Sequence, residues 1–156
     1  MSNRDQVKNH SPANILHAWL LVSSLAADPE APVDSLWRAY VNYKPDGVDI
    51  VVVTDSGGRL DGRSMRTGRT YKHPAVQVLT QGAANHEQEA WDVIERIETA
   101  LDKLKRKTVT LQEDFQYRIN SATKLSVPTA LGRSPETDRP MFSLNVLLDI
   151  TPCKNK

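Results

Sequence analysis

The sequence predicts an α+β domain in which a central, mainly antiparallel sheet is flanked by an N-terminal helix and a longer central helix, with a long Arg/Gly-rich loop between two strands. Three observations predict this class. Apolar residues recur at helical spacing in residues 15–26 and again in residues 91–104. Several short runs alternate β-branched or aromatic residues with polar ones. Gly and Pro residues separate these runs and mark the turns.

Length and composition suit one domain of this kind. The chain has 156 residues, 39% of them hydrophobic, which is enough for a core without disulfides or metals. We expect a flexible N-terminal arm at 1–10, a single domain at 11–152 and a C-terminal tail at 153–156. The single cysteine, Cys153, excludes an internal disulfide and a cysteine-rich metal site. No apolar run approaches the roughly 18 residues of a membrane helix, and residues 1–10 lack the apolar segment of a secretory signal.

The first helix has a clear start. Ser11 suits the N-cap and Pro12 suits the first helical position. The apolar stripe that follows includes Trp19, which we expect in the core. Pro29 and Pro32 end the helix, because the residue before a proline avoids the helical conformation.

Three strands are expected next. The first two, at 36–43 and 48–55, flank the turn-forming sequence Lys44-Pro45-Asp46-Gly47 and should form a hairpin or lie as neighbours. The second contains three successive valines at 51–53, which predicts a strand covered on both faces. The third strand is expected at 75–81.

The central helix has the strongest pattern in the chain. We expect Asn85 to cap it, and acidic residues crowd its first turns. Its apolar stripe consists of Trp91, Ile94, Ile97, Leu101 and Leu104. Four cations are interpreted as complementing the negative end of its dipole: Lys103, Lys105, Arg106 and Lys107. Further strands are expected at 108–111, 115–121 and 142–150, and the last alternates most cleanly.

The most informative segment is a long basic loop at residues 57–73. Its four glycines make a helix or a core strand costly in backbone entropy. Five cations against one Asp give it a net charge of +4, on a chain whose net charge is +1. Three interpretations stay open: a solvated loop, a contact with protein neighbours, and a contact with nucleic-acid phosphates. The candidate partner-binding residues are Arg59, Arg63, Arg66, Arg69 and Lys72.

A second irregular loop is expected at 127–140, which holds three prolines and a glycine. Arg133 and Arg139 are its candidate partner-binding residues. In a cyclic assembly one surface of a subunit meets a different surface of the next, and this loop or a free strand edge could supply such a contact.

No motif in the sequence has the spacing of a reaction centre. Residues 57–64 nearly match the phosphate-binding pattern G-x-x-x-x-G-K-[ST], but Arg63 replaces its lysine and the residues that follow cannot form the helix that completes the anion site. The histidines at 10, 17, 73 and 86 lie at no metal-ligand spacing. We therefore expect no catalytic residue, no cofactor and no metal, and we do not expect an enzyme.

Besides the opening and central helices, a set of segments occurs in a distinctive order within residues 12–150: Tyr43-Lys44-Pro45-Asp46, the strand from Val48 to Asp55, Arg63-Ser64-Met65-Arg66-Thr67-Gly68, His73-Pro74-Ala75-Val76-Gln77-Val78, Tyr117-Arg118-Ile119, Leu131-Gly132-Arg133 and Phe142-Ser143-Leu144-Asn145. In this order the segments resemble the tail terminator and minor tail proteins of long-tailed bacteriophages. One departure is the strand end at 79–81, where the family pattern predicts an arginine after a hydrophobic position.

The resemblance implies a structural virion protein. Such proteins form hexameric rings that cap the head-proximal end of the tail tube, stop its polymerisation and form part of the neck at the head–tail junction. The implied partners are further copies of the chain, the tail tube protein, the head-completion or connector protein and, without specificity, the double-stranded DNA in the lumen. The implied localisation is the virion, and the host cytoplasm during assembly, without membrane contact.

Within this picture the basic loop is expected to dock on protein, because a strongly attractive lumen would slow the passage of DNA. The alternatives from other classes are a basic-loop nucleic-acid-binding module, another neck or minor capsid protein of the same particle, and a small enzyme of unknown chemistry. A ring has several times the mass of a single chain, so sedimentation distinguishes the ring-forming protein from the alternatives.

Overall fold

The computed structural model describes residues 10–30, 36–63, 65, 70–111, 115–135 and 137–153, with the backbone alone at 59–63 and 70–72. Two helices and seven strands lie in this part of the chain, so the predicted α+β class is confirmed. In order they are α1 (Pro12–Val22), β1 (Arg38–Val41), β2 (Ile50–Arg63), β3 (Thr70–Gln81), α2 (Glu87–Asp102), β4 (Lys105–Thr110), β5 (Gln116–Lys124), β6 (Thr129–Arg133) and β7 (Pro140–Pro152).

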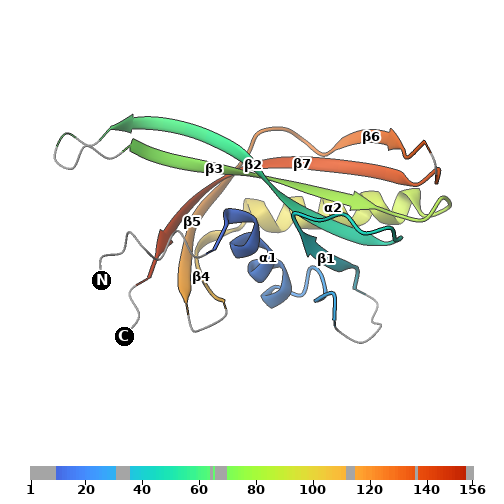
Figure 1. Cartoon of the computed structure of the whole chain (residues 1–156), viewed down its shortest axis with the longest axis horizontal. Coiled ribbons are helices and arrows are strands. Elements are labelled where there is room, and N and C mark those ends of the chain that lie inside the picture. Colours follow the sequence, from blue (N-terminus) through green and yellow to red (C-terminus); the bar gives the residue numbers. More distant parts are fainter. Residues whose placement is uncertain are drawn as a thin grey trace.

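All seven strands belong to one curled sheet. Its order is β1-β2-β3-β7-β5-β4, and β6 pairs with β7 beside this path. β1 and β2 run parallel, whereas the other neighbouring pairs are antiparallel. β7 is shared: its first half pairs with β3 and β6, and its second half pairs with β5. The sheet curves over both helices, which lie on its inner side (Figure 1).

α1 begins as predicted. The Ser11 hydroxyl accepts a hydrogen bond from the Asn14 amide at 3.3 Å, and Pro12 opens the first turn. Trp19 is 4% exposed, which confirms its predicted place in the core. The helix ends at Val22, before the apolar stripe does, and Ser24 with a φ of 57° turns the chain away. No helix among the described residues is long and apolar enough to cross a membrane.

α2 is confirmed, but both of its predicted ends were wrong. His86 rather than Asn85 is the N-cap, and its side chain makes no capping hydrogen bond. The helix stops at Asp102, where the amides of Lys103 and Leu104 close a tight last turn. The cations at 105–107 belong to β4, because pairing with β5 outweighs the helical preference of Lys and Arg. The predicted stripe does face the core, with Ile94, Ile97 and Leu101 buried.

β1 and β2 were predicted to form a hairpin or to lie as neighbours. They are neighbours and do not form a hairpin. Arg38 pairs with Ile50 in parallel register, so residues 42–49 carry the chain back along the strand. Asn42 and Asp49, with φ of 53° and 57°, turn the chain at the two ends of this return. The three valines at 51–53 are all buried, as predicted for a strand covered on both faces.

The predicted irregular loop at 127–140 was wrong for its first half. β6 occupies residues 129–133 and forms a hairpin with β7. A bulge at Gly132, with a φ of 85°, accommodates the glycine, and hydrogen bonds from Ser134 N to Arg139 O and from Asp138 N to Ser134 O close the turn. Prolines at 128, 135 and 140 flank the strand rather than interrupt it.

Candidate functional site

β2 and β3 continue beyond the rest of the sheet as a two-stranded ribbon. Residues 58–63 pair with residues 70–74, whereas β1 pairs with β2 only up to Val53 and β7 pairs with β3 only from Ala75 onward. Figure 1 shows this ribbon projecting from the body of the molecule. An irregular loop was therefore the wrong prediction for these residues, since their backbone groups pair with each other outside the core.

Three of the five predicted basic candidates, Arg59, Arg63 and Lys72, lie on the ribbon. Arg66 and Arg69 lie outside the described residues. An isolated two-stranded ribbon is at best marginally stable in water. The ribbon is therefore an element that gains stability when a partner covers it.

The root of the ribbon is held firmly. The register of β2 against β3 shifts between Asp55 and Gly58, which marks a bulge. A Cβ atom on Gly58 would overlap the backbone of His73, so only glycine fits there. On the other side, the Asp55 carboxylate accepts hydrogen bonds from Ala13 N at 2.9 Å and from Asn42 Nδ2 at 2.8 Å. The ribbon thus leaves the body from a fixed point.

Arg133 lies at the opposite end of the molecule from the ribbon (Figure 1). Its guanidinium donates to the carbonyl oxygens of Ala84 and Asp138, both at 2.8 Å, and pairs with Glu87 at 3.3 Å. These bonds hold the end of β6 against the start of α2. The residue therefore has a structural role within the chain.

Arg139 is similarly engaged. Its Nη1 donates to Asp46 Oδ1 at 2.8 Å and to the Gly47 carbonyl at 3.0 Å, and its side chain is mostly covered. This contact fastens the turn before β2 to the start of β7. The structure thus separates both loop arginines from the ribbon, and the predicted basic residues do not form one site.

Sequence reasoning missed a second basic surface, on β4. β4 is the last strand of the sheet, and its outer edge pairs with no described strand. A usable signal was present in the sequence, because Thr108, Val109 and Thr110 follow the cations directly and favour a strand. We call the four exposed cations at the end of α2 and the start of β4 the β4 basic strip: Lys103, Lys105, Arg106 and Lys107.

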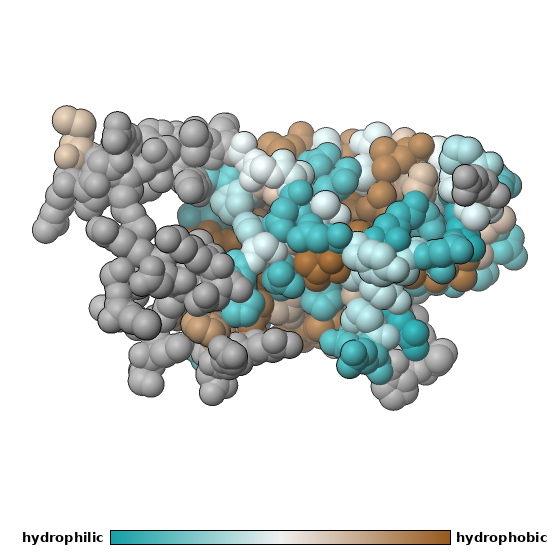
Figure 2. Space-filling model, viewed as in Figure 1, coloured by the Kyte–Doolittle hydropathy of each residue, from teal (hydrophilic) through white to brown (hydrophobic). Residues whose placement is uncertain are grey.

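An exposed apolar group lies on β6 and just before it. Leu125, Val127 and Leu131 are 54%, 71% and 46% exposed, and all five residues of β6 are exposed. Figure 2 shows apolar atoms along the margin of the body where β6 and β7 lie. Among the described strands β6 pairs only with β7, so its outer edge is open. Open edges with apolar side chains are surfaces that a partner covers.

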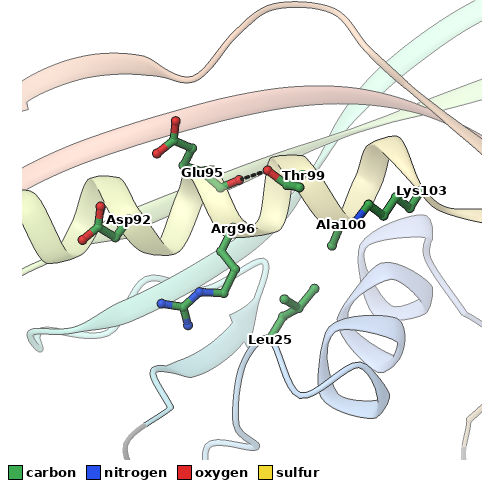
Figure 3. Close-up of a pocket in the computed structure, with 7 residues that line it drawn as sticks. All are labelled: Leu25, Asp92, Glu95, Arg96, Thr99, Ala100 and Lys103. Carbon is green, nitrogen blue, oxygen red and sulfur yellow. Dashed lines mark hydrogen bonds between the residues drawn. The ribbon is translucent and has the colours of Figure 1, made fainter.

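A shallow groove of about 590 Å³ runs along α2 beside the segment that follows α1. Figure 3 shows Arg96 reaching from α2 into the space beside Leu25, with Asp92 one turn earlier on the helix. Glu95 points the other way, so the charged groups do not converge on one point. The groove therefore offers no defined ligand site.

The titratable side chains serve the fold. Burial raises the pKa of the Tyr117 phenol above its ordinary value. Within the described ranges no group of three or more His, Cys, Asp or Glu side chains is placed to hold a metal ion. Histidine side chains bond within the chain, among them His10 to the Tyr117 hydroxyl, His17 to the Ala39 carbonyl and His86 to the Asp49 carboxylate.

Comparison with known proteins adds no family assignment. No protein-family model matches the chain, and no curated protein matches it. The ribbon, the β4 basic strip and the open edge of β6 are therefore the features from which a function can be inferred.

Proposed function

We propose that this chain is a structural virion protein of the tail-terminator type, which forms a hexameric ring on the head-proximal end of a phage tail tube. The observation that carries the proposal is the two-stranded ribbon, which pairs only with itself from residue 58 to 63 and from 70 to 74. The ribbon has no sheet beside it, and residues 57–73, which include it, carry a net charge of +4, so it gains most when it lies against another molecule. An arm of this kind suits an assembly protein.

The open edge of β6 supplies a lateral contact for the ring. A closed ring requires two different complementary surfaces on each copy. Leu125, Val127 and Leu131 lose solvent contact when a neighbour covers them, and burial of such side chains contributes about 25 cal/mol per Å² of apolar area. In this arrangement the edge of β6 lies against the next copy and leaves the ribbon free for another protein.

The remaining partners follow from the resemblance. The ribbon docks on the tail tube protein or on the head-completion or connector protein, and the ring then ends tube growth and joins the head. Double-stranded DNA passes through its lumen. The protein acts in the neck of the virion after assembly in the host cytoplasm.

Charge reversal on the ribbon tests the proposal. R63E/R66E/R69E should abolish capping, because three positive side chains that face an acidic partner become repulsive. The matched control K44E/R96E/R118E changes the charge by the same amount at exposed positions on the body. Tails are examined by electron microscopy, and infectious particles are counted after complementation with each variant. Overlong tubes and headless tails are expected only for the ribbon variant, and a normal particle yield from it would refute the proposed role.

A further inference from the structure

The charges of this chain are strongly segregated. Residues 57–73 carry a net charge of +4 and residues 103–107 another +4, so the rest of the chain carries −7 if the total is +1. Figure 1 places β4 and the ribbon toward the same end of the molecule. Arg133 and Arg139, at the other end, are engaged with acceptors of the chain itself. β4 and the positions of Arg59, Arg63 and Lys72 on the ribbon therefore lie toward the same end of the molecule.

The cations of the β4 basic strip have no acidic partner within the described part of the chain. None of the four makes an ion pair with the described part of the chain, and all four are exposed. In a regular strand every second side chain would turn toward the core. Lys105, Arg106 and Lys107 are nevertheless all exposed, and Arg106 has a φ of 49°, which departs from the strand conformation. This arrangement concentrates charge on an open sheet edge.

We propose that the β4 basic strip binds the phosphate backbone of duplex DNA without reading its sequence. Cations that have no carboxylate partner are free to neutralise the phosphates of a polyanion. Each neutralised phosphate releases condensed counterions, and this release favours binding. The strip contains no aromatic side chain on which unpaired bases could stack, which favours a duplex over a single strand.

A protein partner fits this strip less well. Lysines on an edge strand disfavour the addition of a further strand. The inference is independent of ring formation.

The experiment compares two variants of the full chain with the same change in net charge. K105Q/K107Q removes two cations of the strip, and K44Q/R96Q removes two exposed cations elsewhere. Binding to a labelled duplex of about 20 base pairs is followed by fluorescence anisotropy between about 50 and 200 mM salt. The slope of log K against log salt should fall in magnitude by about 1.8 for K105Q/K107Q, at roughly 0.9 for each lost phosphate contact. K44Q/R96Q should leave the slope unchanged.

Three outcomes would overturn the inference: no binding of the duplex by the unaltered chain at the lowest salt, equal slopes for both variants, or lost self-association of K105Q/K107Q with DNA binding intact. The last would assign the strip to a second copy. Circular dichroism should show both variants folded, and K103Q/K107Q gives the same comparison should K105Q/K107Q unfold. Because ring mass is measured separately by mass photometry, failure of this inference is distinguishable from failure of the ring.

Discussion

Gly58 pairs with Pro74 at the root of the ribbon and lies so close to His73 that a Cβ atom on Gly58 would overlap the His73 carbonyl oxygen. Gly58 also has a φ of 132°, which other residues rarely adopt. Glycine is therefore the residue that this bulge at the root of the ribbon can accommodate.

Replacement of this glycine should be costly. G58A is expected to lower the free energy of unfolding by about 1–3 kcal/mol, because it combines a strained backbone with steric overlap. G47A is the control, since the nearest atom to its Cβ is Ile50 Cγ2 at 3.8 Å, and it should change stability by less than about 0.5 kcal/mol. Urea unfolding measures both. Equal stabilities would show that the ribbon can rearrange at its root.

The open edge of β6 should govern self-association. V127S/L131S is expected to reduce the mass of the assembled protein in mass photometry, because it removes the apolar surface proposed to meet the next copy. V22S/V48S removes two valines that are 66% and 45% exposed elsewhere, and the assembly should tolerate it. If both variants assemble like the unaltered chain, β6 is not the lateral contact.

Tyr117 should contribute to the loss of stability at high pH. Burial raises the pKa of its phenol above 10.0, so in the folded state it holds its proton at a pH where the unfolded chain has released it. Its contribution is complete below about pH 10 and declines as the pH rises through the folded-state pKa. Unfolding monitored from about pH 8 to 12 should therefore show a weaker alkaline decline for Y117F.

Two comparisons separate the contribution of Tyr117 to the alkaline loss of stability from the contributions of other titratable groups. Y43F replaces a tyrosine that is 64% exposed and should leave the alkaline decline intact. The hydrogen bonds that Lys124 donates to the Glu98 and Asp102 carboxylates raise the pKa of its ammonium group, so part of the decline has the same sign and should remain in Y117F. Identical pH profiles for Y117F and Y43F would contradict the assignment to Tyr117.

Arg133 should stabilise the β6–β7 hairpin rather than bind a partner. R133M removes the bonds to Ala84, Asp138 and Glu87 and is expected to cost about 1 kcal/mol, because the side chain remains partly solvated. Amide hydrogen exchange in β6 should accelerate. R118M, which removes an exposed arginine bonded to Asn120, should leave exchange in β6 unchanged. Unaltered exchange in R133M would mean that the hairpin is held by other contacts.

Local patterns determined the fold class and most of the elements. Ser11 and Pro12 place the start of α1, the apolar stripe of α2 faces the core, and the alternation at 142–150 lies within β7. These features depend on residues a few positions apart, which the sequence displays directly. The cations at 57–73 were also visible as the main candidate contact surface.

Tertiary structure alone decided which element several of these segments join and which residues they contact. Residues 58–63 entered a ribbon because residues 70–74 pair with them, with Gly57 and Gly62 at the two register shifts, and the cations at 105–107 left the helix because β5 lies beside them. The parallel direction of β1 and the acceptors of Arg133 likewise depend on which distant segments meet. The physical reason is that strand pairing and side-chain partners join residues far apart in the chain, where periodicity carries no information.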